Sequence, residues 1–253
     1  MRSTGEPTDI GMNRTGVQIS PKLAKEMEEG ARQIQPPPGG EEKIAEVRMS
    51  YQARAMPVGT MPPPGTVKGM AKAAGKALKG EKATALLDKM GERMAFERSG
   101  VRLYEAMITK LLGSGEMEDI GLTEEALRKI QTEELDHMYL VAEAIEQMGG
   151  DPTTETPCAD VAGVQAEGLV QTLVDPRTTV AQGLSSILAA ELVDNASWEL
   201  LVELAREFGN DALADSFDVA RRQEVEHLRQ VRGWYETLTK REAEGMPAFT
   251  QPT

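Results

Sequence analysis

The chain has 253 residues, 40% of them hydrophobic but only 4% aromatic, so a core would consist mainly of aliphatic side chains and methionine. A single cysteine, Cys158, excludes an internal disulfide and a thiolate metal cluster. The formal net charge of −13 argues against nucleic-acid binding, because phosphate groups would be repelled. No apolar leader opens the chain and no run of about 18 apolar residues occurs, so we expect a cytoplasmic protein without a membrane span.

Residues 1–81 are expected to form a largely irregular extension with short helices. "QPPPGG" and "MPPPGT" interrupt it, and proline removes helical hydrogen-bond donors. "SPKLAKEMEEGARQ" predicts one short helix. Further along, Lys68, Lys72, Lys76 and Lys79 fall on one helical stripe. We interpret this stripe as the solvated face of an alanine-rich helix, the alternative being contact with an anionic membrane or nucleic acid.

Residues 82–242 predict four long helices. The first ends at "GSG"; the second begins after Thr123, a good N-cap, and ends at "MGGDPT". The third begins near Thr179, and the fourth follows a "GND" turn and continues to about Glu244. The second connection has about 30 residues and is expected to contain a short helix. The pattern predicts an all-α protein, an antiparallel four-helix bundle with a long crossover between helices two and three, followed by a tail, residues 243–253.

The buried face of each predicted helix is apolar except near its middle. Alternating steps of three and four residues trace this face. Both histidines of the chain lie on it, each three residues after a glutamate. The polar residues at mid-helix are Glu97 in the first helix, Glu134 and His137 in the second, Glu191 in the third, and Glu224 and His227 in the fourth.

Four buried carboxylates would be prohibitively costly if they were ionised and unpaired. Protonation would relieve some of them, whereas two divalent cations would neutralise all four. A Glu and a His three positions apart in a helix can reach the same metal. One Glu from each of two helices with Glu-x-x-His from the other two is the pattern of dinuclear carboxylate sites. Oxygen and imidazole ligands favour two Fe ions, with Mn/Mn or Mn/Fe as alternatives.

At these residues the chain resembles the ferritin-like superfamily, which includes bacterioferritin and rubrerythrin. Tyr104 follows Glu97 by seven positions, Glu191 and Glu224 are 33 residues apart, and "QEVEHLRQVRGWYETL" is similar to the fourth helix of bacterioferritin. The resemblance implies that Glu97 and His137 bind one metal, Glu191 and His227 bind the other, and Glu134 and Glu224 bridge the two. The long extension, the longer crossover and the lack of chain for a fifth helix argue against a storage cage.

The resemblance implies an oxidoreductase that reacts with O2 or H2O2, like a ferroxidase, peroxidase or manganese catalase, and a homo-oligomer. The alternative is a non-catalytic structural or iron-storage protein. A DNA-protecting mini-ferritin fits less well, because its metal sites lie between subunits. Tyr104 is expected to hydrogen-bond Glu191 rather than to react, and Asn195 to support a ligand. Trp198 and Trp234 are interpreted as core filling.

Overall fold

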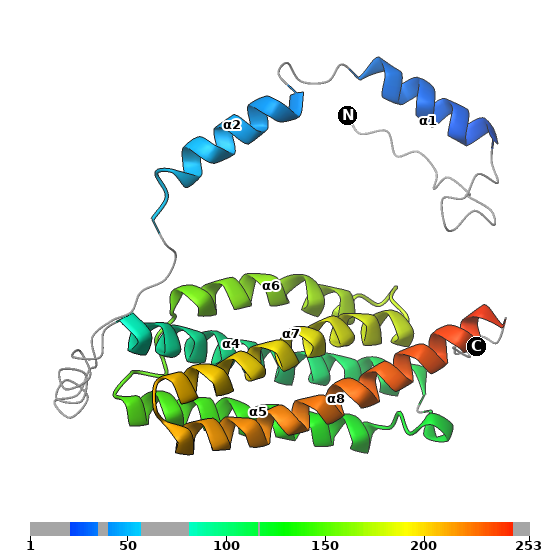
Figure 1. Ribbon diagram of the computed structural model, residues 1–253. Coiled ribbons are helices and arrows are strands. Elements are labelled where there is room, and N and C mark those ends of the chain that lie inside the picture. Colours follow the sequence, from blue (N-terminus) through cyan, green and yellow to red (C-terminus); the bar gives the residue numbers. More distant parts are fainter. Residues whose placement is uncertain (1–20, 35–39, 57–80, 116, 245–253) are drawn as a thin grey trace. The chain divides into compact units, whose positions relative to one another are not determined.

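The protein is all-helical wherever the computed structural model describes it, which is over residues 21–34, 40–56, 81–115 and 117–244 (Figure 1). Within these ranges every regular element is a helix, and the one β pairing is an isolated bridge between Met117 and Leu122. The predicted all-α class is therefore confirmed. None of the described helices is both long and apolar enough to cross a membrane.

The chain divides into two compact units, Met1–Met56 and Pro57–Thr253. The first contains α1 (Pro21–Gln33) and α2 (Gly40–Gln52), and α1 confirms the short helix predicted there. The predicted lysine stripe, Lys68–Lys79, lies outside the described residues.

The second unit carries the long helices. Their boundaries follow the prediction closely, but the helix expected within the long connection is an 18-residue element and not a short one. Its buried residues are mostly alanines, whose small side chains let it pack closely against the first long helix. The elements are α4 (Glu81–Ser114), the 3-10 helix η1 (Glu118–Ile120), α5 (Glu124–Met148), α6 (Pro157–Val174), α7 (Val180–Glu207) and α8 (Asp211–Ala243).

Side-chain caps determine where the helices begin. Thr123, Thr156 and Thr179 each accept a hydrogen bond from a backbone N–H of the first turn of α5, α6 and α7. At α7 the side-chain oxygen of Gln182 also accepts a hydrogen bond from the backbone N–H of Thr179, which completes a capping box. Asn210, the middle residue of the predicted "GND" turn, caps α8 in the same way. These bonds satisfy amides that a helix leaves free at its N-terminus.

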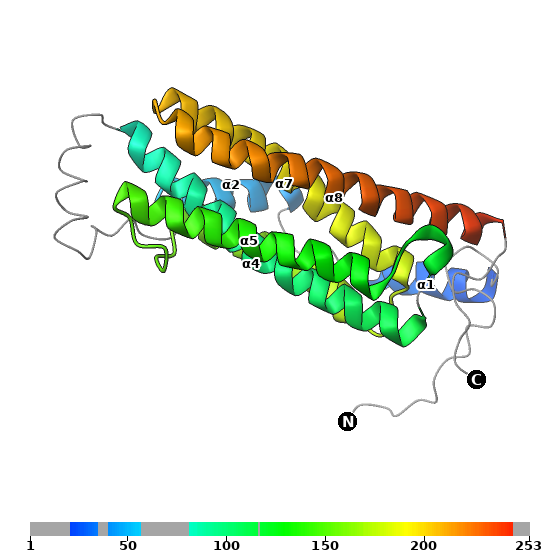
Figure 2. The same cartoon turned by 90° about the horizontal axis from the view of Figure 1, so that it is seen from below.

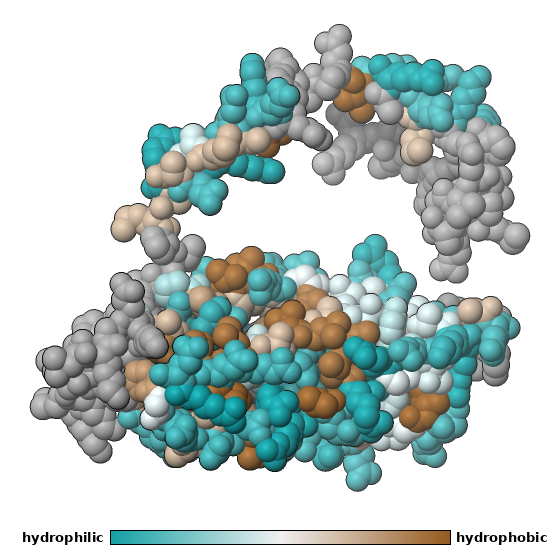
Figure 3. All heavy atoms as spheres, viewed as in Figure 1, coloured by the Kyte–Doolittle hydropathy of each residue, from teal (hydrophilic) through white to brown (hydrophobic). Residues whose placement is uncertain are grey.

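The long helices run alongside one another in alternating directions (Figures 1 and 2). α4 packs against α5, α6 and α7, while α8 packs against α7 and α5. α6 runs alongside α4 and in the same direction, so that α7 starts at the end of the unit opposite to the end of α5 (Figure 1). The face seen in Figure 3 is mainly hydrophilic, with apolar patches over α6 and α7. Their exposed apolar side chains include Val161, Val164, Leu192, Val193 and Leu200.

The core has two hydrophobic clusters separated along the helices. One includes Leu86 and Met90 of α4 with Val141 of α5, and the other includes Leu103 of α4 with Leu127 of α5. On α5, α7 and α8 the polar mid-helix positions fall between the two clusters, and on α4 Glu97 directly follows Phe96, the first α4 residue of the second cluster. Apolar layers therefore close the polar layer at both ends.

Replacing the α7 cap by Thr179→Ala should lower the free energy of unfolding by about 1 kcal/mol, because the capping box is lost. The melting temperature should fall by about 2–4 °C. Thr237→Ala is the matched control, because Thr237 lies inside α8, far from its N-terminus, and donates its hydroxyl to the carbonyl of Gly233. Equal thermal melts for the two variants would show that the cap does not stabilise α7.

Candidate metal centre

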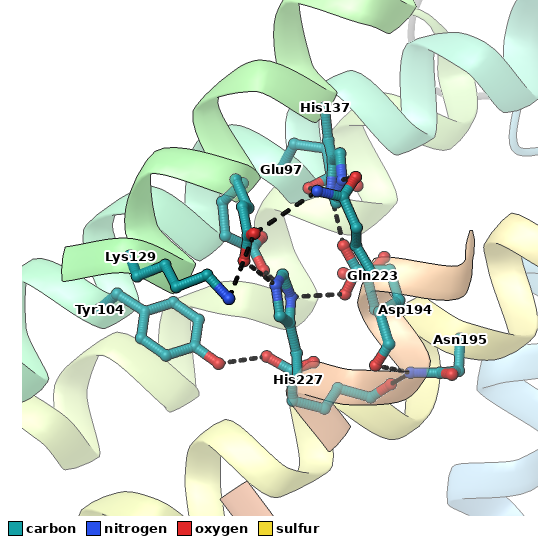
Figure 4. Close-up of polar contacts among 12 residues, drawn as sticks. Glu97, Tyr104, Lys129, His137, Asp194, Asn195, Gln223 and His227 are labelled. Atoms are coloured by element: carbon teal, nitrogen blue, oxygen red, sulfur yellow. Dashed lines mark hydrogen bonds and ion pairs between the residues drawn. The ribbon is translucent and has the colours of Figure 1, made fainter. Parts of the chain in front are cut away.

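The structure brings the six predicted ligand residues together in the middle of the second unit (Figure 4). They come from α4, α5, α7 and α8, and none is more than 2% exposed. The rings of His137 and His227 have centroids 6.0 Å apart. Whether these residues bind metal stays a prediction at this point.

Both imidazoles present Nδ1 to the interior of the cluster. The Nδ1 of His137 lies 2.6 Å from Oε1 of Glu224, and the Nδ1 of His227 lies 3.2 Å from Oε2 of the same carboxylate. Glu134 Oε1 is 3.4 Å from His227 Nδ1, and Glu97 Oε2 is 3.9 Å from His137 Nδ1. Glu224 thus offers one oxygen beside each imidazole, which is the arrangement that a bridging carboxylate requires.

The cluster fits a metal because most of its inward-facing atoms lack a well-formed hydrogen bond. Five of the six residues have a buried atom that makes no well-formed hydrogen bond: Glu97 Oε2, Glu134 Oε1, His137 Nδ1, Glu191 Oε2 and Glu224 Oε1. Buried polar atoms are normally satisfied, so several in one place require an explanation. Carboxylate oxygens and imidazole nitrogens are also the donors that iron and manganese prefer.

Two sets of these residues have donor atoms within 4.8 Å of one another. The first consists of Glu134, Glu191, Glu224 and His227; the second consists of Glu97, His137 and Glu224. Glu224 belongs to both sets. Glu134 belongs to the first set, and to a third that contains Glu97, Asp194 and Glu224.

The outward-facing histidine nitrogens are held by residues that the sequence analysis did not select. Nε2 of His227 lies 2.9 Å from Oε2 of Glu133, and Nε2 of His137 lies 3.0 Å from Oε1 of Gln223 (Figure 4). Gln223 Nε2 in turn donates to Glu133 Oε1 at 3.5 Å. When Nδ1 binds a metal, the proton of each neutral imidazole is on Nε2, which then donates to Glu133 or Gln223, so these bonds fix the orientation of both rings. Outside them lies a surface pocket lined by Lys129, Glu133, Val219, Arg222, Gln223 and Glu226.

A buried ion pair, also missed from the sequence, lies beside the cluster. Arg93 and Asp194 are 1% and 2% exposed, and a guanidinium nitrogen of Arg93 pairs with a carboxylate oxygen of Asp194. Nε of Arg93 also lies 2.9 Å from Oε1 of Glu97. Helical spacing was the available signal, because Arg93 precedes Glu97 by four positions and Asp194 follows Glu191 by three. Five buried carboxylates against one guanidinium leave four negative charges, which two divalent cations would balance.

Three further residues have defined contacts. The hydroxyl of Tyr104 donates to Oε1 of Glu191 at 2.5 Å, as expected from the sequence. The amide of Asn195 donates to the backbone carbonyls of Glu191 and Glu224, at 3.0 Å each, so it ties α7 to α8 rather than touching a carboxylate. Trp198 is fully buried in a core cluster, as interpreted, and its Nε1 in addition donates to Oε1 of Glu97 at 2.8 Å. A buried indole N–H requires an acceptor.

Burial changes the protonation of the metal-free cluster. Burial and repulsion by Glu224 raise the pKa of Glu134 to about 7 and the pKa of Glu191 to about 8. Burial opposes ionisation of Glu224 too, but hydrogen bonds from both histidines outweigh it and lower the pKa of Glu224. Burial also opposes a charge on His227, but hydrogen bonds to Glu134 and Glu224 raise its pKa to about 12. Without metal, protons therefore neutralise the excess charge.

No known family model matches the chain, and neither a curated protein nor a solved structure does. The geometry of the site is therefore what a functional assignment depends on.

Gly100 gives the carboxylate of Glu134 its space. A Cβ at this position would lie 2.2 Å from Glu134 Oε2 and 3.0 Å from its Cδ. Gly100→Ala should favour helix by about 0.5–1 kcal/mol but push that carboxylate out of the cluster. We expect the variant to fold as stably as the original without metal, while the rise in melting temperature on adding Mn²⁺ becomes smaller. Gly113→Ala is the control, since nothing lies within 4 Å of a Cβ there; equal responses would contradict the role of Gly100.

The metal-free protein should lose stability as the pH rises from about 5 to 8. The carboxyl groups of Glu134 and Glu191 have pKa values of about 7 and 8 in the folded state, against 4.5 as the ordinary value. A carboxyl group whose pKa is raised in the folded state contributes its full stabilisation when the pH is below the ordinary pKa. This contribution is lost as the pH rises through the folded-state pKa. Urea denaturation of chelator-treated protein measures the effect.

The double variant Glu134→Gln/Glu191→Gln should flatten this dependence, because an amide resembles a protonated carboxyl group and does not titrate. A metal-free wild type whose stability rises over the same range would show that both carboxylates are ionised and paired.

Proposed function

We propose that this chain is a dinuclear metal protein of the ferritin-like superfamily. In this proposal α4, α5, α7 and α8 form an antiparallel four-helix bundle, and α6 lies in the crossover between its second and third helices. The alternating helix directions and the packing of α6 along α4 support it. The homo-oligomer and the cytoplasmic location stay predictions.

One observation carries the proposal: carboxylate oxygens and imidazole nitrogens from four helices converge in a buried layer, and most of them lack a well-formed hydrogen bond. Apolar clusters lie on both sides of this layer, so water does not solvate the charges. Two iron ions, or manganese in one or both positions, would supply the missing positive charge. Glu97, Glu191, His137 and His227 would each hold one ion, and Glu134 and Glu224 would bridge.

We infer an oxidoreductase that reacts with O2 or H2O2. A bound pair of iron ions would supply the redox change and the Lewis acidity for reducing either oxidant. The chain contributes the geometry: Glu133 and Gln223 orient the imidazoles, and the Tyr104 hydroxyl restrains Glu191. A surface pocket lined in part by Glu133 and Gln223 lies against the residues that hold the outer nitrogens of the two imidazoles.

A non-catalytic metal site, for structure or iron storage, is the second candidate. The observation that favours it is the near-complete burial of all six ligand residues, since structural sites are closed and catalytic ones keep an open position. The surface pocket is lined by Glu133 and Gln223 and not by the ligands themselves.

Oxidation of Fe²⁺ separates the two candidates. If the centre reacts, anaerobically loaded protein mixed with O2 or H2O2 should oxidise Fe²⁺ faster than buffer does. Glu134→Ala or Glu224→Ala should abolish the difference, because each removes a bridging carboxylate, while Tyr104→Phe should slow the reaction less. Loading should also raise the melting temperature. Metal at a hundredfold excess over the dissociation constant adds roughly 2.7 kcal/mol per site to the free energy of unfolding.

The matched controls are Glu143→Ala and Glu236→Ala, which remove exposed carboxylates from α5 and α8. Both should behave as wild type. Metal-dependent stabilisation without oxidation above the buffer rate would favour the structural or storage role. A melting temperature that does not respond to Fe²⁺ or Mn²⁺ would contradict metal binding.

A further inference from the structure

The two imidazoles of the cluster have chemically different partners behind them. Nε2 of His227 bonds to the carboxylate of Glu133, whereas Nε2 of His137 bonds to the neutral amide oxygen of Gln223 (Figure 4). A carboxylate behind a ligating imidazole increases its basicity and its strength as a metal ligand. An amide oxygen fixes the ring but adds no charge. His227 is therefore the stronger donor of the two.

Glu97 and Glu191, the glutamates that would each hold a single ion, also have different partners, and the difference again favours the His227 side. Oε1 of Glu97 lies 2.9 Å from the charged guanidinium of Arg93 and accepts the indole N–H of Trp198 at 2.8 Å. Oε1 of Glu191 accepts only a neutral phenol, from Tyr104. The positive charge of Arg93 draws electron density from Glu97 and repels a cation bound beside it, and burial makes both effects larger than in water.

The partner behind the imidazole and the partner of the glutamate that holds one ion therefore both favour the His227 side.

We propose that the two metal positions are unequal. The position held by Glu191 and His227 fills first and retains its ion. The position held by Glu97 and His137 fills second and exchanges its ion, and Glu134 and Glu224 bridge the two. Glu133 strengthens the first position, and Arg93 and Gln223 weaken the second. This inference rests on the dinuclear site of the proposed function.

Titration with Mn²⁺, followed by electron paramagnetic resonance, tests the order of filling. The first equivalent should give the spectrum of isolated Mn²⁺, and the second should convert it to that of a spin-coupled pair. Glu191→Gln should remove the tighter step. Glu97→Gln should keep the tighter step and remove only the weaker one. A coupled pair that appears in wild type from the first additions, or loss of the tighter step in Glu97→Gln, would overturn the proposal.

The double exchange Glu133→Gln/Gln223→Glu tests the cause. It preserves composition, net charge and the adjacency of one carboxylate and one amide, but places the carboxylate behind His137. Replacing the hydrogen-bond partner of a metal ligand typically changes metal affinity by about 10–100-fold. The ratio of the two dissociation constants should therefore shrink at least about tenfold. Calorimetric titration with Mn²⁺ measures this ratio, and circular dichroism of the metal-free variant checks the fold. An unchanged ratio in a folded variant would overturn the proposal.

The outcomes for wild type distinguish this inference from the proposed function. Two ions bound with equal affinity would overturn only the inequality of the positions. No binding of Mn²⁺ or Fe²⁺ would overturn the dinuclear site and the inference with it.

Discussion

Burying five carboxylates in the middle of a helical core creates an excess of negative charge that the nearby residues do not balance. Arg93 supplies one positive charge, and it is already held by Asp194 and Glu97. In the metal-free protein, raised pKa values keep Glu134 and Glu191 largely protonated at low pH. Protons and metal ions are thus alternative ways of neutralising the same layer, so metal binding should release protons and depend on pH.

Other features of the second unit follow from this constraint. The two apolar clusters on either side stabilise the helices and also keep water from the charged layer. Gly100 leaves room for a carboxylate where a methyl group would collide with it. Asn195 joins the backbones of α7 and α8 at the depth of their glutamates. Together these contacts hold the ligands in place before any ion binds, which lowers the cost of forming the site.

Much of the fold and of the candidate site was predictable from periodicity. The helix boundaries follow caps such as Thr123 and Thr179, and the ligands appear as polar interruptions of an apolar face. α6 was underestimated because its packing face is mostly alanine, which carries a weak hydrophobic signal. Its length depends on contact with α4, and local sequence does not show such contacts.

The supporting residues were missed for a physical reason. Glu133 and Gln223 directly precede ligands, and neighbours in a helix point about 100° apart, so the pattern assigns them to the surface. They are only half-buried, and their role appears only when α5 and α8 lie side by side. Arg93 and Asp194 lie near the buried face, but charged residues there are normally solvated. The hydrogen bond of Trp198 was missed because its acceptor, Glu97, lies on a different helix.

The most direct test of the central claim is X-ray diffraction from crystals grown with Mn²⁺, recorded above and below the manganese absorption edge. Two anomalous peaks about 3.5–4 Å apart are expected, the usual separation in two-metal sites, with the Glu224 carboxylate between them. A cluster without anomalous density, in which His137 and His227 still pair with Glu224 as they do without metal, would contradict the account.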